Sequence, residues 1–202
     1  MSCITNIESY YFEPETEIIA GEIVPPITES HKIETEYPSV VERYFTKYFY
    51  CRNDNIEEAH IILHHSNRIC LVGLDKTHVA VQKGIQSINF DIGGNDRSKN
   101  QVSGKSKRGG LNLQPTSVIA VVTCNDGSEY KICSAINAKL VEVNECLLAN
   151  PSLIGKDGDG YVAVVLPKIE KVTDIIGGLL TECQFKEKIE QKLSNDDNSK
   201  IN

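Results

Sequence analysis

Histidine and cysteine side chains that lie close together in the sequence are the first candidates for metal binding or nucleophilic chemistry. Two cysteines and three histidines share one stretch: Cys51, His60, His64, His65 and Cys70. A structural zinc site needs four ligands, usually with a close pair of cysteines, and a nucleophilic cysteine needs a base that a third group orients. The spacing provides neither arrangement. We therefore interpret His64 and His65 as an exposed pair in a turn and the cysteines as small buried apolar residues.

A second candidate is the segment Asp157-Gly158-Asp159-Gly160, whose paired aspartates are typical of calcium loops. An EF-hand loop also requires a third ligand position and a distal glutamate, and this segment has neither. Glycine and aspartate are favoured in turns, so we predict a turn. The sequence as a whole predicts no catalytic residue, no metal site, no cofactor and no enzymatic activity.

Residues 93–110, called the cationic segment below, are the one stretch whose charge indicates what kind of partner it could bind. Its 18 residues are rich in Gly, Asn and Ser, and Val102 is its sole candidate for the core. Five basic side chains stand against Asp96: Arg97, Lys99, Lys105, Lys107 and Arg108. These are the candidate partner-binding residues, because cations set among small residues are free to meet phosphates or an acidic protein surface. A loop of this length is usually functional or mobile.

Three interpretations of the cationic segment stay open. It is a solvated loop, the binding site of an acidic protein partner, or, less favoured, a nucleic-acid contact. Proteins that bind nucleic acid usually add stacking aromatic residues, and this segment has none.

Length and composition indicate a single-domain protein of a reducing compartment. A chain of 202 residues is close to one domain's worth. Its seven cysteines form an odd set without a CxxC pair, and the N-terminal MSCITNIESYY lacks the basic and apolar regions of a signal peptide. The longest aliphatic run, 161–166, is far shorter than the ~20 residues that span a bilayer. We expect a reduced, intracellular protein with no membrane partner.

The net charge of −7 is concentrated at the N-terminal end. Residues 1–37 carry eight glutamates against Lys32, and the remaining residues are neutral in sum. This segment has too little apolar periodicity to offset the entropy of ordering it. We therefore predict a mostly disordered acidic tail over 1–37, with 17–24 as the piece able to dock, a single domain over 38–193, and a polar tail over 194–202.

Helical signals stand at both ends of the predicted domain. Ser39 and Glu42 have the spacing of a capping box, and Val41, Phe45 and Phe49 recur at helical intervals, which predicts a helix from Pro38 to about Tyr50. At the other end, Thr181 and Gln184 form a second capping-box pair. The apolar stripe that follows it consists of Phe185, Ile189 and Leu193. It predicts a C-terminal helix.

Strand signals fill the interior of the chain. Residues 60–63 and 69–74 are short β-rich runs joined by a polar hairpin connection, and 88–92 alternates as a half-buried strand does. Residues 118–124 and 129–133 flank Asn125-Asp126-Gly127-Ser128, whose Asp-Gly pair favours a type I′ turn with positive φ at both central residues.

The passage LVEVNECLLANPSLIGKDGDGYVAVVLP, residues 140–167, alternates strand and helix signals. It reads as a strand over 140–143, Asn144 as a helix cap, a short helix over 145–149 ended by Pro151, a glycine-rich turn, and an apolar strand over 161–166. This order resembles the corresponding part of the glycine cleavage H protein, a lipoyl-carrying barrel-sandwich hybrid. The expected fold class is therefore mainly β, a β-rich α+β barrel-sandwich with flanking N- and C-terminal helices.

A second resemblance spans about residues 40–193 and rests on six motifs in order. They are VERYFTKYF (41–49), HSNRIC (65–70), VSGKSKRG (102–109), NDGSEY (125–130), GYVAVVLPK (160–168) and GLLTECQF (178–185). Together these resemble the Abitram family of actin-binding transcription modulators. The resemblance implies a protein that binds actin monomers and filaments, influences filament growth in cell projections, and resides in the nucleus, in nuclear speckles, and in the cytoplasm.

The resemblance to lipoyl carriers raises a rival function, because those proteins expose a modified lysine at a tight hairpin turn. Counting back from Val143-Asn144-Glu145 without a gap, the acceptor position falls on Gly127, which has no amine. Lys131 lies four residues on, within the strand rather than at the tip. A lipoyl-type carrier is therefore disfavoured, and an RNA-associated nuclear module is the third alternative.

Overall fold

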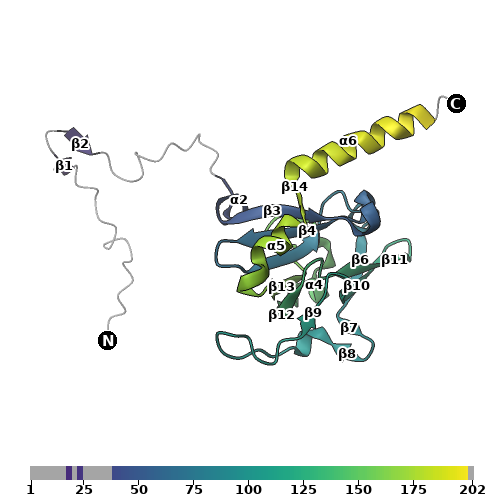
Figure 1. The fold of residues 1–202 in the computed structure, drawn as a ribbon, viewed down its shortest axis with the longest axis horizontal. Helices are drawn as coiled ribbons and strands as arrows, with labels where there is room; N and C mark the ends of the chain where they lie inside the picture. Colours follow the sequence, from purple (N-terminus) through teal and green to yellow (C-terminus); the bar gives the residue numbers. More distant parts are fainter. Residues whose placement is uncertain (1–16, 20–21, 25–37, 200–202) are drawn as a thin grey trace, which may run out of the picture. The chain divides into compact units, whose positions relative to one another are not determined.

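The computed structural model describes residues 17–19, 22–24 and 38–199 (Figure 1). The chain divides into two units, Met1–Pro38 and Ser39–Asn202. In the first unit β1 (Glu17–Ile19) and β2 (Glu22–Val24) pair antiparallel, with Ile18 opposite Ile23. Within the predicted acidic tail, 17–19 and 22–24 are thus two paired strands. The rest of the predicted disordered tail lies outside the described residues.

The second unit is rich in strands and has short helices between them. Its strands are β3 (Phe45–Tyr50), β4 (His60–His65), β5 (Cys70–Leu74), β6 (Ile85–Asn89), β7 (Asp91–Ile92), β8 (Asn95–Asp96), β9 (Asn112–Leu113), β10 (Val118–Cys124), β11 (Glu129–Cys133), β12 (Ala138–Val143), β13 (Ala163–Leu166) and β14 (Leu180–Thr181). Its α-helices are α2 (Val40–Tyr44), α3 (Val79–Lys83), α4 (Cys146–Ala149), α5 (Val172–Gly177) and α6 (Glu182–Ser199). Five 3₁₀ turns complete it: η2 (Arg52–Asp54), η3 (Ile56–Glu58), η4 (Arg97–Lys99), η5 (Pro151–Leu153) and η6 (Ile169–Lys171).

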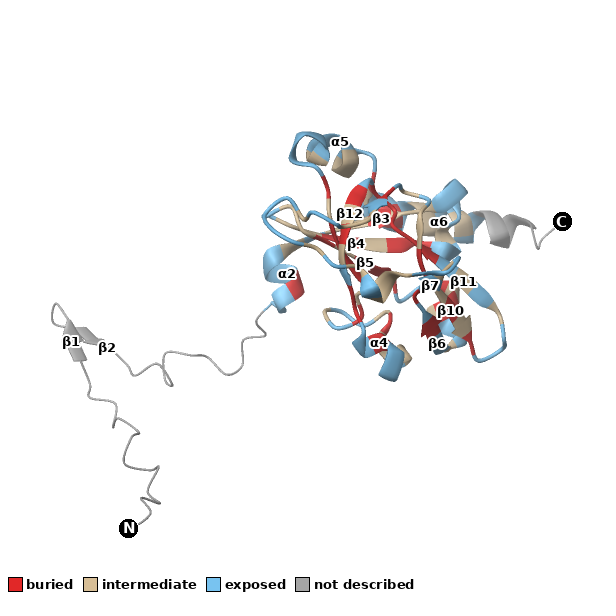
Figure 2. Cartoon of the chain, turned by 90° about the horizontal axis from the view of Figure 1, so that it is seen from below, coloured by how far each residue is buried: buried red, intermediate tan, exposed pale blue. Residues whose placement is uncertain are grey.

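Two antiparallel sheets hold the core between them. The larger sheet has seven strands in the order β14-β3-β4-β5-β13-β12-β9, and the smaller has three in the order β11-β10-β6. Fully buried side chains from both sheets form one cluster: Ile62, Val72, Leu140 and Val165 from the larger, and Ile119, Val122 and Ile132 from the smaller. Figure 2 shows the buried residues concentrated along these strands. The predicted β-rich α+β class with flanking helices is confirmed.

The N-terminal helix is shorter than predicted. The capping box is present, since Ser39 Oγ accepts from the Glu42 N–H at 3.2 Å and Glu42 Oε2 accepts from the Ser39 N–H at 2.7 Å. However, α2 ends at Tyr44, and Phe45–Tyr50 is strand β3, paired with β4 along its whole length. The physical reason is that a spacing of four residues fits the helical and the strand period equally well. Aromatic and β-branched residues then favour the strand.

The hairpin β10–β11 has the bounds that the sequence predicts, but its turn is different. The Cys124 N–H donates to the Ser128 carbonyl at 2.8 Å, which leaves Asn125, Asp126 and Gly127 as a three-residue loop. Among these three residues only Gly127 has positive φ, at 80°. The type I′ prediction is therefore wrong, and the geometry is that of a longer loop that ends in a left-handed glycine.

The two histidines predicted for a turn belong to a strand instead. His64 and His65 are the last residues of β4, opposite Cys70 and Phe45 respectively. His65 packs edge-on against Phe45, with ring centroids 5.1 Å apart. The pairing of β3 with β4 therefore extends the strand through both histidines.

The C-terminal helix also differs from its predicted bounds. Its capping pair forms, with Gln184 Oε1 accepting from the Thr181 N–H at 2.9 Å. Phe185 stacks on Phe49 at 4.0 Å between ring centroids, but Leu193 is 60% exposed, so the buried stripe ends before it. The helix continues to Ser199, where a polar tail from residue 194 is predicted. Within the described part of the chain, no helix is both long and apolar enough to cross a membrane.

Candidate functional site

The cationic segment begins in the hairpin of β7 and β8, where the sequence predicts only a long loop. Asp91 pairs with Asp96 and Ile92 with Asn95, and Gly93 and Gly94 form the turn between them. Both glycines have positive φ, 62° and 78°, as a two-residue type I′ turn requires. The Gly-Gly dipeptide was the available signal. The segment is therefore more regular than a long loop.

Arg97 and Lys99 both lie in the turn η4, and Lys99 is paired within the segment. Asp96 Oδ1 accepts from the Ser98 N–H at 3.0 Å, and the Lys99 Nζ lies 3.3 Å from Asp96 Oδ2. Hydrogen bonds from Ser98, followed by the charge of Lys99, lower the pKa of the Asp96 carboxyl. Arg97 is half-buried, and its Nε has no hydrogen-bond partner among the described residues. These two predicted site residues are less available to a partner than their charge suggests.

Two polar side chains attach the rest of the segment to the larger sheet. Asn100 Nδ2 donates to the carbonyls of Leu140 and Val141, both at 3.1 Å. Its Oδ1 accepts from the Leu111 N–H at 3.1 Å. Lys139 Nζ donates to the carbonyls of Ser106 and Lys107, at 3.2 and 3.4 Å. The segment is therefore fastened along β12, and its sequence gave no sign of these partners.

Residues 103–108, called the cationic hairpin below, present the remaining three candidates together. Ser103 and Arg108 exchange two backbone hydrogen bonds of 2.9 Å across the turn. Lys105 and Arg108 are exposed, and Lys107 is half-buried. In the part of the chain that the structure describes, no carboxylate forms an ion pair with any of these three side chains. The structure thus brings Lys105, Lys107 and Arg108 onto one supported tip.

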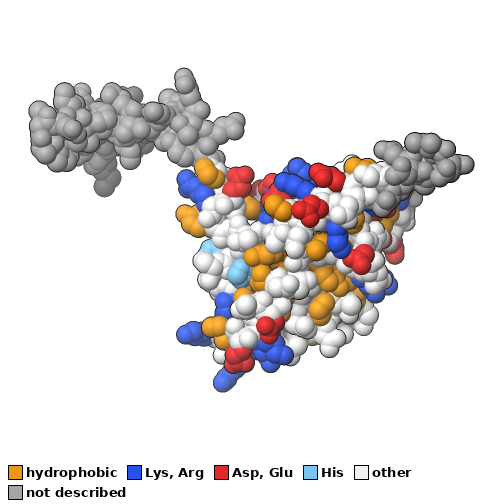
Figure 3. All heavy atoms as spheres, turned by 45° about the horizontal axis from the view of Figure 1, so that its top comes forward, with side chains coloured by type: hydrophobic (Ala, Val, Ile, Leu, Met, Phe, Trp, Pro, Cys, Tyr) orange, Lys and Arg blue, Asp and Glu red, His pale blue; other side chains and the backbone are white. Residues whose placement is uncertain are grey.

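Surface charge elsewhere is mixed. On the face shown in Figure 3, basic and acidic side chains lie interspersed around apolar patches. Exposed pairs such as Lys188–Asp54 and Lys192–Glu57, both at 2.6 Å, neutralise charge locally. Other lysines of the described chain also lack ion pairs, so Lys105, Lys107 and Arg108 stand out because they lie together on one short hairpin.

The tip of β10–β11, where a lipoyl carrier would hold its lysine, is clamped to α3. The Lys83 Nζ lies 2.8 Å from Asp126 Oδ2 and 3.2 Å from Ser128 Oγ. Hydrogen bonding to Asp126 raises the pKa of Lys83, and the same bond lowers the pKa of Asp126. A Cβ at Gly127 would meet nothing within 4 Å, so the acceptor position is open but holds no amine. Lys83 is not predictable as a partner of this tip, since nothing in the sequence links it to a turn that far away.

His60 is a structural residue rather than a ligand. Its Nε2 accepts from the Cys133 N–H at 2.9 Å, and its Nδ1 lies 3.0 Å from the Glu58 carbonyl, which assigns the ring proton to Nδ1. It joins β4 of the larger sheet to β11 of the smaller. Burial lowers the pKa of His60 to about 4, and burial followed by the charge of His60 lowers the pKa of His78 to about 4. No group of three His, Cys, Asp or Glu side chains within the described ranges is arranged to hold a metal ion.

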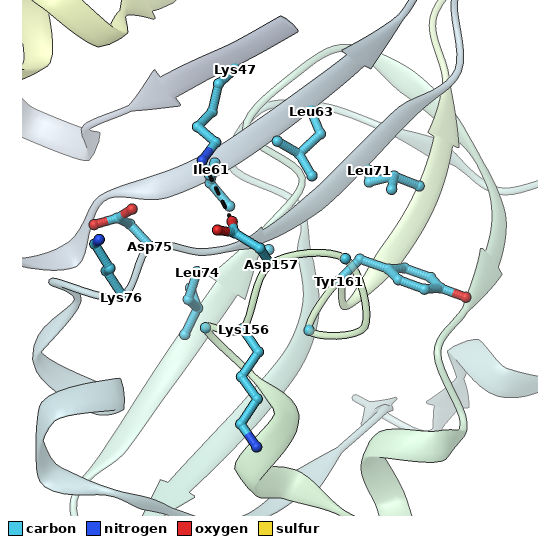
Figure 4. A pocket seen from close by; sticks show the side chains of 14 residues that line it. Lys47, Ile61, Leu63, Leu71, Leu74, Asp75, Lys76, Lys156, Asp157 and Tyr161 are labelled. Atoms are coloured by element: carbon cyan, nitrogen blue, oxygen red, sulfur yellow. Dashed lines mark hydrogen bonds and ion pairs between the residues drawn. The ribbon is translucent and has the colours of Figure 1, made fainter. Parts of the chain in front are cut away.

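The glycine-rich segment 155–160 forms turns beside a small cavity of about 60 Å³ (Figure 4). Asp157 Oδ1 pairs with the Lys47 Nζ at 3.5 Å, while Lys156 and Tyr161 point away from that pair. Space of this size holds a few water molecules, whereas small-molecule sites are several times larger. The predicted turn is confirmed.

Comparison with known proteins identifies the family. No protein-family profile matches the chain. It is 46% identical to Protein Abitram of Drosophila melanogaster over 188 residues, covering 92% of this chain and 86% of that protein. It is 39% identical to Protein Abitram of Homo sapiens over 179 residues, covering 83% and 96%. A glycine cleavage system H protein from Mycobacterium marinum aligns with a TM-score of 0.46 and 16% identity, covering 71% of this chain and 96% of that one. On the strength of its sequence relatives, this chain belongs to the Abitram family.

Proposed function

We propose that this chain is a non-enzymatic actin-binding protein that regulates the assembly of actin filaments, with actin monomers and filaments as its partners. Two findings support the proposal: the family membership, and the six sequence motifs that the family resemblance rests on. The observation that carries it is the cationic hairpin, whose three cations have no carboxylate partner among the described residues. Cations held apart from intramolecular partners are available to an acidic protein surface.

The hydrogen bonds that hold the cationic hairpin on the sheet also favour a binding role. Lys139 holds its backbone and Asn100 fixes the chain just before it to β12, so binding would cost little ordering of the main chain. Lys105 and Arg108 are exposed and Lys107 is half-buried, and long cationic side chains suit a contact that is electrostatic, fast to form and sensitive to salt.

Lys99 and Arg97 lie in the same segment but outside the hairpin. They contribute less, because Lys99 is paired with Asp96 and the Nε of Arg97 is buried.

Co-sedimentation with actin filaments tests the proposal. The triple variant Lys105→Ala, Lys107→Ala and Arg108→Ala should bind about tenfold more weakly, since each exposed charge contact is worth a fraction of a kcal/mol. A matched control removes three other basic side chains, Lys76→Ala, Lys131→Ala and Lys156→Ala, which are exposed on other elements. The control should bind as the parent does.

Salt dependence separates a charge contact from a general loss of binding. Exposed charges are screened over ~8 Å at physiological ionic strength, so the parent should weaken as salt rises and the triple variant should respond less. If the triple variant binds like the parent at low and at high salt, the cationic hairpin is merely solvated. The next surface to examine would then be α2, where Val40 and Tyr44 are 67% and 56% exposed.

A nuclear role, with residence in nuclear speckles, and a cytoplasmic role in cell projections belong to the same proposal. They are supported by the family resemblance. Imaging a fluorescent fusion of the full chain tests both compartments, and exclusion from the nucleus would contradict the nuclear part.

A further inference from the structure

A groove runs beside α5, and its wall includes Lys139, which also donates to the backbone of the cationic hairpin. It consists of two adjoining hollows of about 360 and about 400 Å³, which share Asn137, Lys171 and Ile175 in their walls. Each hollow is in the size range of small-molecule and peptide sites. Because they share these three residues, the two hollows lie next to each other, and the groove named below consists of both.

One end of the groove is basic. Its charged side chains are Lys139, Lys168 and Lys171, with no carboxylate in the wall at this end. Lys168 and Lys171 are exposed, and across the described residues none of the three lysines forms an ion pair. Lys139 is held in place by the carbonyls of the cationic hairpin. The lining of this end therefore carries three lysines and no carboxylate, although exposed Glu170 lies between Lys168 and Lys171 in the sequence.

The other end of the groove is mainly apolar. Tyr50, Pro115, Ile175 and Leu179 line it, and Asp174 is its single carboxylate. The helix α5 that borders the groove has no buried residue of its own. Such a wall leaves room for an apolar side chain to pack against half-buried Ile175.

The groove also borders the edge of a sheet. Asn112 and Leu113, in its basic half, form β9, the last strand of the seven-stranded sheet. An edge strand offers backbone N–H and C=O groups on its open side, and extended peptides are commonly recognised in this way. A sheet edge, a group of lysines and an apolar surface thus all lie along this groove.

We propose that this groove binds an extended segment of a partner protein, with acidic side chains at the end formed by Lys139, Lys168 and Lys171 and an apolar side chain at the end formed by Tyr50 and Leu179. A protein segment fits better than nucleic acid, because the basic end offers no aromatic ring for base stacking and no arginine. The inference goes beyond actin binding, since it concerns other residues and a linear acidic sequence rather than a folded surface.

Fluorescence anisotropy of the full chain tests the groove directly. The probe is a fluorescein-labelled peptide with glutamates at its amino end and leucine and phenylalanine at its carboxyl end. The double variant Lys168→Glu and Lys171→Glu should bind the probe at least about tenfold more weakly, because two attractive contacts become repulsive. Ile175→Ala should weaken binding by about threefold through lost apolar contact.

A control variant with the same change of net charge makes the result specific. Lys131→Glu with Lys156→Glu alters two exposed lysines outside the groove and should bind the probe within about twofold of the parent. Circular dichroism establishes that each variant is folded, and Lys168→Gln with Lys171→Gln replaces the charge reversal if that variant is not.

Three outcomes would overturn the proposal. In the first, the parent does not bind the probe. In the second, the groove and control variants lose binding equally, which would indicate a non-specific charge effect. In the third, a single-stranded oligouridylate binds the parent more tightly than the peptide and is lost in the groove variant, which would make the site a nucleic-acid groove. Since the probe contains no actin, failure of actin co-sedimentation leaves this test unaffected.

Discussion

Two hairpin tips of this protein differ in what happens to their charges. At the tip of β10–β11, Asp126 is paired with Lys83, and the Asn125 N–H donates to the Gly84 carbonyl at 3.0 Å. At the tip of the cationic hairpin, Lys105, Lys107 and Arg108 lack a carboxylate partner among the described residues, and only the backbone beneath them is held. The Asp126 charge of the first tip is paired within the molecule, whereas the charges of the second tip are available to another molecule.

The difference shows that the clearest turn signature in the sequence does not mark the hairpin with unpaired charges. Asp126-Gly127 gives the sharper sequence signature, yet its role is to close a strand pair against α3. The cationic hairpin has a weak signature of glycine, serine and lysine, yet it is the tip with unpaired charge. Local sequence identifies turns well because turn geometry is local, whereas the pairing of a charge depends on residues far along the chain.

The largest expected effect is an acid sensitivity confined to the base of β10–β11. The pKa of His60 is about 4 in the folded protein against 6.5 ordinarily, and His78 behaves alike. The unfolded chain therefore binds more protons in this window, so the stabilising contribution is complete above pH 6.5 and is lost as the pH falls toward 4. Each histidine accounts for at most about 3 kcal/mol.

Urea unfolding at neutral pH and at pH ~5 measures this loss. His60→Leu should lower stability at neutral pH, because the buried Cys133 N–H loses its acceptor, and should also flatten the pH dependence. An unchanged pH dependence in His60→Leu would show that His60 is not the group responsible.

A smaller effect is expected where the cationic segment is attached to the sheet. Asn100→Ala removes three side-chain hydrogen bonds, to Leu140, Val141 and Leu111. Partly buried polar groups left unpaired cost about 1–3 kcal/mol in the free energy of unfolding. Amide hydrogen exchange should also speed up at Ser103 and Arg108 but not along β10–β11. Asn95→Ala, at an exposed residue of β8, is the control and should change neither measurement.

The smallest expected effect is that of a lipoyl ligase, which should leave the mass of the protein unchanged. Protein expressed with a lipoyl ligase should keep its unmodified intact mass, because Gly127 has no amine and Lys83 is paired at the tip. Lys131 is exposed on β11, away from the acceptor position. A lipoyl group found on Lys131 or Lys83 would revive the carrier function and would make the β10–β11 tip the functional one of the two hairpins.

Much of the fold follows from local sequence, and its failures have physical reasons. The Ser39–Glu42 capping box and the bounds of β10 and β11 were predictable because each rests on contacts within a few residues. Phe45–Tyr50 was misassigned, since its spacing suits a helix and a strand equally and its pairing with β4 decided between them. For the site, sequence named the five cations. It could not show that Lys139 holds the backbone of the tip, or that Asn100 fixes the chain before the tip to β12, because those partners are distant in the sequence and meet only in the folded chain.

The attachment of the cationic hairpin has a consequence for how such a protein diverges. Asn100 lies before the hairpin, and after it the Leu140 N–H donates to the Leu111 carbonyl at 2.8 Å. Both ends of the intervening stretch are thus fixed to β12 independently of the residues at the tip. Insertions, deletions or new side chains within 103–108 should leave the sheet undisturbed, so selection can alter partner preference at this position while the scaffold stays constant.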